Sequence, residues 1–176
     1  MLFMDRVPDF EALLSRIQSP ALLALAQHWN AARGKKRMPC WAELSLGDSA
    51  PYAKLLWGFA YDPKSQMFTG CLVGAKASRW FGETFCGARL DEVHAPVNFG
   101  EAQRILTQSV TTPSAARFSG RLFKSDNFVV SGERLLLPVA ENGVMGDGIL
   151  GASDYAPPPL LGRLEMIHEN EEWYAI

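Results

Sequence analysis

Apolar residues near the N-terminus recur at the spacing of an amphipathic helix, three and four positions apart. The first stripe consists of Phe10, Leu13, Leu14 and Ile17. Ser19-Pro20 begins a second helix, because serine is a good N-cap and proline suits the first helical turn. The second stripe consists of Leu22, Leu25, Ala26 and Trp29. We therefore predict a helical N-terminal segment over residues 1–39.

From Leu55 the hydrophobic period changes to two, which is typical of a half-buried strand. The residues on one side of this strand are Leu55, Trp57, Phe59 and Tyr61. A turn at residues 62–65, rich in turn formers, separates it from a second apolar segment at residues 67–74. The spacing predicts an antiparallel hairpin.

The second half of the chain alternates between short helices and strands. We predict helical pieces at residues 76–81, 90–93 and 99–111, followed by strands at about 117–122, 128–139 and 144–153. In the first of these strands Phe118 and Leu122 alternate with Arg117 and Arg121, which predicts one buried and one solvated face. Two strands, a helical insert and three strands indicate an α+β fold with an antiparallel sheet.

Domain organisation follows from the same pattern. One sheet-containing core spans residues 40–156, and a triple proline separates it from an acidic tail at residues 157–176, which we expect to pack as a small extra element. A chain of 176 residues is long enough for one domain with a full hydrophobic core.

Charge, cysteine content and the length of the apolar stretches bear on the kind of partner and on the location of the protein. The net charge of −2, from 17 basic and 19 acidic residues, does not suggest a nucleic-acid-binding surface. Three cysteines without a CxxC pair indicate reduced thiols and hence a cytoplasmic location. The apolar stretches are shorter than the ~20 residues that span a bilayer, so we expect no membrane span.

Several segments, in this order and spacing, resemble a bacterial single-domain PAS-like family that was formerly known as a domain of unknown function. The matching segments are 29–39, 68–74, 80–82, 87–90 and 133–138. The resemblance covers about residues 22–152 and implies a five-stranded antiparallel sheet with helices over one face. It also implies a sensory, ligand-binding or dimerising role without catalytic residues. Cys71 and Cys86 depart from the family, where a basic residue and a threonine are common.

Three motifs that suggest catalytic or cofactor chemistry have simpler interpretations. The glycines of residues 146–151 fit GxGxxG, but no helix can follow them, so we interpret them as a turn and a strand. The three histidines, His28, His94 and His168, are too far apart in sequence for a zinc motif. His94 as a haem ligand and Cys86 as a flavin-reactive thiol are both disfavoured, so the sequence requires no cofactor and leaves the identity of any cofactor open.

Aromatic residues on the insert and on the facing strands predict a pocket for a small apolar or planar ligand. The candidate pocket residues are Trp80, Phe81, Phe85, Phe99, Phe118, Phe128, Leu135 and Leu137. A closed, fully packed core is the alternative for the same residues.

We expect a sensory or regulatory PAS-like module in signal transduction that binds this ligand or a signalling protein and is not an enzyme. A homodimer through the N-terminal helix is a second expectation, with Leu13, Ile17 and Leu22 at the contact if the helix does not fold back on the sheet. Two alternatives stay open. One is a purely structural interaction module, and the other is a small enzyme that pairs His94 with Glu133.

Overall fold

The computed structural model describes residues 7–155 and 164–176 and is built around one seven-stranded antiparallel sheet. The strands are β1 (Leu56–Asp62), β2 (Met67–Val73), β3 (Ser114–Lys124), β4 (Val129–Val139), β5 (Gly148–Tyr155), β6 (Glu165–Met166) and β7 (Asn170–Ala175). Their order across the sheet is β2-β1-β5-β4-β3-β6, and β7 also pairs with β3. The predicted α+β class with an antiparallel sheet is confirmed.

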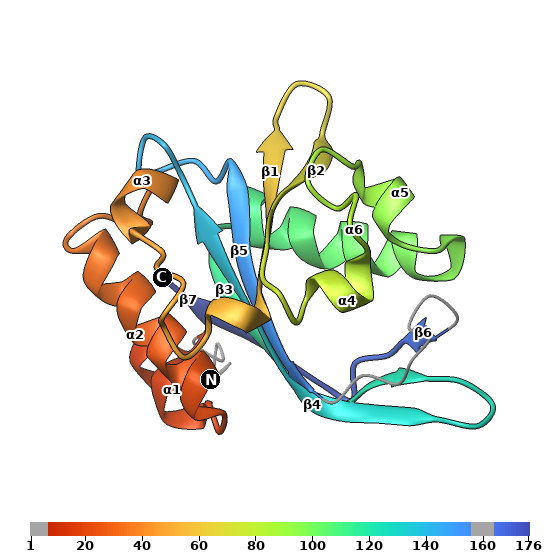
Figure 1. The fold of residues 1–176 in the computed structure, drawn as a ribbon. Coiled ribbons are helices and arrows are strands. Elements are labelled where there is room, and N and C mark those ends of the chain that lie inside the picture. The colour runs from red at the N-terminus through yellow and green to blue at the C-terminus, as the bar shows by residue number, and fades with distance from the viewer. Residues whose placement is uncertain (1–6, 156–163) are drawn as a thin grey trace, which may run out of the picture.

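Helices cover both faces of this curled sheet (Figure 1). The N-terminal helices α1 (Phe10–Arg16), α2 (Pro20–Arg33) and α3 (Trp41–Leu44) lie on one face. A short 3-10 turn, Ala53–Leu55, then leads into β1. The insert between β2 and β3 covers the other face with α4 (Ser78–Phe81), α5 (Leu90–Val93) and α6 (Pro96–Thr111). The predicted hairpin β1–β2 and the predicted order of elements through β5 are both observed.

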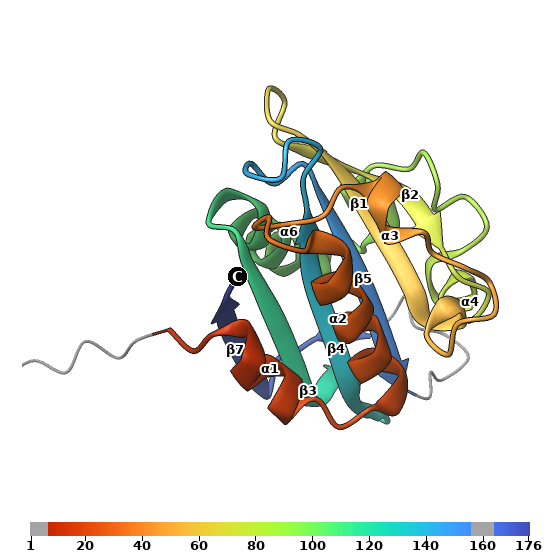
Figure 2. The ribbon, with the colours of Figure 1, turned by 90° about the vertical axis from the view of Figure 1, so that its left-hand side faces the viewer.

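Side-chain caps fix the ends of the two N-terminal helices. The carboxylate of Asp9 accepts a hydrogen bond from Ala12 N at 3.1 Å, and the hydroxyl of Ser19 accepts one from Leu22 N at 3.3 Å. Pro20 occupies the first turn of α2, as predicted. Figure 2 shows α1 and α2 lying across the strands.

This packing buries the N-terminal apolar stripe inside the molecule. Leu13 and Leu22 are fully buried and Ile17 is 8% exposed, because α1 and α2 fold back on the sheet. The stripe is therefore not available for the expected homodimer contact. It forms one of two cores instead, together with the inward side chains of β4 and β5.

The C-terminal tail extends the sheet. β7 pairs with β3 along Ser114–Ser119, and Tyr174 is buried against the N-terminal core. Residues 164–176 were expected to pack as a small extra element, and in the structure their strands β6 and β7 belong to the main sheet; the triple proline lies outside the described residues. Among the helices that the structure describes, none is long and apolar enough to cross a membrane.

Candidate functional site

Two small adjoining cavities lie between the helical insert and the sheet. Their volumes are about 30 and 50 Å³, enough for one or a few water molecules each. Both are lined by Phe81, His94, Phe123 and Tyr155. The first also reaches Trp57, Arg134 and Ser153, and the second reaches Trp80 and Asn98. We call this pair the insert cavity.

Most of the predicted pocket residues lie on this side of the sheet. Phe81 lines both parts of the insert cavity and Trp80 lines one. Phe85 and Phe118 are fully buried in the surrounding core, and Phe99 packs against it. Of the predicted pocket residues, Trp80 and Phe81 line the insert cavity, whereas Phe85, Phe99 and Phe118 lie in or against the surrounding core.

Three predicted pocket residues are placed elsewhere. Leu135 and Leu137 belong to the core beneath the N-terminal helices, because side chains alternate along a strand and those of Arg134 and Leu136 face the insert. Phe128 is 57% exposed, just before β4 begins, and contributes to neither core. The prediction that these three line a pocket with the insert is wrong.

Stacked rings form the outer wall of the insert cavity. The rings of Trp80 and Tyr155 lie 4.4 Å apart at an interplanar angle of 18°, and Trp57 meets Phe81 edge to face at 6.2 Å. The indole nitrogen of Trp57 donates to the hydroxyl of Ser153 at 3.0 Å. The indole nitrogen of Trp80 is buried and has no hydrogen-bond partner among the described residues.

Arg134 is the charged group of the cavity and is 4% exposed. Its guanidinium lies over the ring of Phe123 at 5.2 Å, and one nitrogen is 3.5 Å from Nε2 of His168. No acidic side chain in the described part of the chain forms an ion pair with it. Burial lowers the pKa of Arg134 and the Tyr155 hydroxyl opposes this, but an arginine stays protonated.

The two histidines near Arg134 are held in the neutral form at physiological pH. Burial and the Arg134 charge lower the pKa of His94 to about 4. The same two causes lower the pKa of His168, although Glu101 opposes them. Nδ1 of His168 donates to Glu101 at 2.9 Å, which leaves Nε2 to accept from Arg134.

Sequence reasoning missed Arg134, Ser153 and Tyr155. An available signal was the alternation of β4, in which Arg134 shares a face with Leu136. A charged residue at an apolar register position is unusual enough to mark a site.

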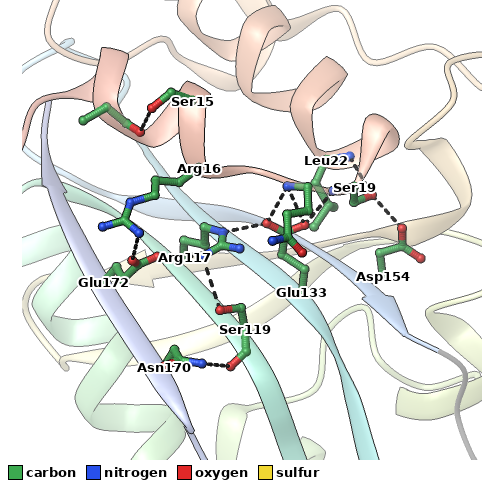
Figure 3. Close-up of polar contacts among 12 residues, drawn as sticks. Ser15, Arg16, Ser19, Leu22, Arg117, Ser119, Glu133, Asp154, Asn170 and Glu172 are labelled. Atoms are coloured by element: carbon green, nitrogen blue, oxygen red, sulfur yellow. Dashed lines mark hydrogen bonds and ion pairs between the residues drawn. The ribbon is translucent and has the colours of Figure 1, made fainter.

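A polar network lies on the opposite face of the sheet, under the N-terminal helices (Figure 3). Glu133 accepts hydrogen bonds from Arg117 Nε at 2.6 Å, Ser19 N at 2.7 Å and Gln18 N at 3.1 Å. Arg117 also pairs with Glu172 at 2.7 Å. The predicted solvated face of β3 is therefore wrong at Arg117, which is 6% exposed because α1, α2 and β7 cover it.

This placement also separates the residues of the enzyme alternative. His94 lies in the insert cavity, and Glu133 points to the other face of the sheet, toward Ser19. The pair cannot act on one substrate. A sheet stands between the two side chains, so the hypothesis that combined them is wrong.

Other candidate groups are accounted for by local contacts. Glu101, His168 and Glu171 bring potential metal ligands within 4.8 Å of one another, but Arg104 forms ion pairs with both carboxylates at 2.6 and 2.7 Å. We interpret the cluster as an ion-pair network. The glycines at 146–151 form a turn and the start of β5, as predicted.

Cys71 is not an activated thiol. Desolvation and the nearby Cys86 thiol raise the pKa of Cys71 to about 11, so its thiol stays protonated.

Comparison with known proteins adds no assignment, because no family model, curated protein or solved structure matches this chain.

Proposed function

We propose that the chain is a PAS-like sensory module that binds a small molecule in the insert cavity and signals to a separate protein. The proposal is supported by the arrangement of β1–β5, which form an antiparallel sheet with α4–α6 inserted over one face. The resemblance implies five antiparallel strands with helices over one face. The observed sheet differs in having seven strands, because β6 and β7 add to β3, and in having the N-terminal helices on its other face. Function still has to be argued from the site, since one fold serves many functions.

The observation that carries the proposal is the insert cavity itself. A core built only for stability would satisfy its buried polar groups, because an unpaired buried donor costs about 1–3 kcal/mol. Here the Trp80 indole nitrogen has no partner in the described residues, and it borders a cavity whose other walls are mostly apolar. Apolar walls with a few polar groups are typical of a small-molecule site.

The cavity volumes set a condition on binding. Since each part holds only one or a few water molecules, a larger ligand requires the side chains shared by both parts to move and join them. The shared Phe81 lies on the short helix α4, where a small displacement of the insert enlarges the site. Ligand binding would thereby change the position of the insert, which is a way to transmit a signal.

Native mass spectrometry of the purified protein, compared with its denatured mass, tests the proposal. Extra mass that is lost on denaturation is the expected result. Ala102→Leu, which fills the space between α6 and the sheet, should abolish it. The control Ala31→Leu, on an exposed position of α2, should retain it. Extra mass that both variants retain would place the ligand elsewhere and contradict the proposal.

A closed structural interaction module is the second candidate, and the small size of the cavities favours it. In that case a protein partner would be recognised by the outer surface, and no small molecule would bind the insert cavity. The two candidate functions differ in one measurable property. Small apolar compounds should change the signals of the buried indole groups in a ligand-binding module and leave them unchanged in a closed interaction module.

A further inference from the structure

Arg134 is a buried cation without a buried anion. Its neighbours are the Phe123 ring, the neutral His168, the sulfur of Met166 and the Tyr155 hydroxyl, and none of these carries a negative charge at neutral pH. His168 connects Arg134 to an acidic residue, Glu101, which lies on the far side of the His168 ring. The Glu101 carboxylate already accepts hydrogen bonds from two Arg104 nitrogens. A buried charge without a partner of opposite sign is strongly unfavourable.

Arg117, the buried arginine on the other face of the sheet, has the carboxylate partners that Arg134 lacks. Arg117 has a side chain that is 7% exposed, and it pairs with Glu133 at 2.6 Å and with Glu172 at 2.7 Å. Two carboxylates therefore compensate one guanidinium there. Arg134 has no carboxylate partner in the described residues. The Tyr155 hydroxyl, the Phe123 ring and His168 Nε2 stabilise its guanidinium only in part, so the site still favours an added anion.

The polar groups in the insert cavity are complementary to a ligand that accepts hydrogen bonds. Arg134 has donors only, and the unpaired Trp80 indole nitrogen is also a donor. His94 is neutral above about pH 4, so it adds no second positive charge. One positive charge matches a monoanion better than a doubly charged phosphate, and guanidinium matches the planar carboxylate.

We propose that the ligand of the insert cavity is an organic monocarboxylate with a small apolar or planar body, and that Arg134 binds its carboxylate. This inference rests on the proposed function, because it assumes that the cavity takes a ligand. The body of the ligand would lie among Trp57, Phe81 and Phe123. The Trp80 indole nitrogen would donate a second hydrogen bond to the carboxylate of the ligand.

Two probes that share a phenyl ring separate the contribution of the carboxylate from that of the ligand body. Benzoate carries a ring and a carboxylate, whereas toluene carries the same ring and no oxygen. We would titrate each into the protein by isothermal calorimetry at neutral pH. Benzoate should bind at least about 10-fold more tightly than toluene, the difference expected for a desolvated charge-assisted contact.

Variants identify the contact residues. Arg134→Met keeps a long apolar side chain over Phe123 and should reduce benzoate affinity to that of toluene. Trp80→Phe keeps a ring against Tyr155 and is less disruptive to the fold, so it tests the inference even if Arg134→Met does not fold. It should weaken benzoate binding at least about 10-fold, as expected for the loss of a hydrogen bond to a charged carboxylate, without changing toluene binding.

The outcomes separate the two proposals. If toluene and benzoate bind equally and Trp80→Phe changes neither, the carboxylate inference is overturned while a ligand-binding cavity stands. If neither probe binds at millimolar concentration and native mass spectrometry finds no ligand, both proposals are overturned. If benzoate binds but Arg104→Gln on the surface weakens it as much as Arg134→Met, the anion site lies outside the cavity and the inference is overturned.

Discussion

Glu133 joins the N-terminal helices to the sheet, and its removal should destabilise the fold strongly. Its side chain is 8% exposed and accepts hydrogen bonds from Arg117, Ser19 and Gln18. We call this set of contacts the Glu133 clamp. Breaking a buried ion pair by removing one partner costs about 3–5 kcal/mol, since the other charge stays buried. Glu133→Ala should therefore lower the free energy of unfolding by about 3–5 kcal/mol.

Urea unfolding followed by circular dichroism measures this loss, and Glu172→Ala is the matched control. Glu172 also pairs with Arg117, but its side chain is 24% exposed, so its removal should cost only about 1 kcal/mol. The double variant Glu133→Leu with Arg117→Met should be more stable than Glu133→Ala, because it also removes the buried Arg117 charge. Glu172 loses Arg117 in this variant, but it is 24% exposed and still lies 3.6 Å from Arg16. A loss below about 1 kcal/mol for Glu133→Ala would refute the reasoning.

Three further predictions concern packing, acid stability and the N-terminal helices. Gly151→Ala should lower the free energy of unfolding in urea by about 1–3 kcal/mol, because the added Cβ would lie 2.3 Å from the Trp57 ring. The control Gly100→Ala, at an open position of α6, should raise it by up to about 1 kcal/mol. Equal effects of the two substitutions would contradict this. The pKa of His94, about 4, is below its unfolded value of 6.5, so the unfolded chain binds a proton first as pH falls. The free energy of unfolding therefore falls as the pH drops from 6.5 to about 4, by at most about 1.4 kcal/mol per pH unit. Unfolding curves of His94→Gln at about pH 7 and pH 5 should show a smaller loss. An equal loss in His94→Gln and the unaltered protein would contradict this prediction. Deletion of residues 1–19, which removes α1, should lower the free energy of unfolding and expose apolar surface to a hydrophobic dye; a stable fold with half the mass in sedimentation would contradict this.

Local patterns were enough to predict the elements of this fold from α1 to β5, but not strands β6 and β7. The hairpin, the three insert helices and strands β3 to β5 follow from the change of hydrophobic period and from turn chemistry. Ser19 and Pro20 marked the start of α2 because capping depends on neighbouring residues alone.

The sequence was a poorer guide to which face of the sheet each strand side chain lies on. β4 carries Leu135, Leu136 and Leu137 in succession, and a continuous apolar run does not reveal which side chains face which layer. Leu135 and Leu137 were therefore assigned to the wrong core. Arg117 was assigned to solvent, since nothing local reveals that two helices and a distant strand cover it.

The candidate site shows the same limit. Its aromatic wall was predicted because Trp80 and Phe81 lie in the insert itself. Arg134 and Tyr155 were missed, because they reach the cavity only through the pairing of β4 with β5. Contacts between residues far apart in sequence create the site, and they depend on register and curvature of the sheet.

Nuclear magnetic resonance of the five ¹⁵N-labelled tryptophan indoles, titrated with benzoate, tests the central claim most directly. The Trp80 signal, assigned with Trp80→Phe, should shift in a saturable manner as its unpaired nitrogen gains an acceptor. Trp29, whose indole donates to Pro138 O at 3.0 Å on the opposite face, should not move. A Trp80 signal that stays unchanged at saturating benzoate, or a Trp29 signal that shifts equally, would contradict a carboxylate site in the insert cavity.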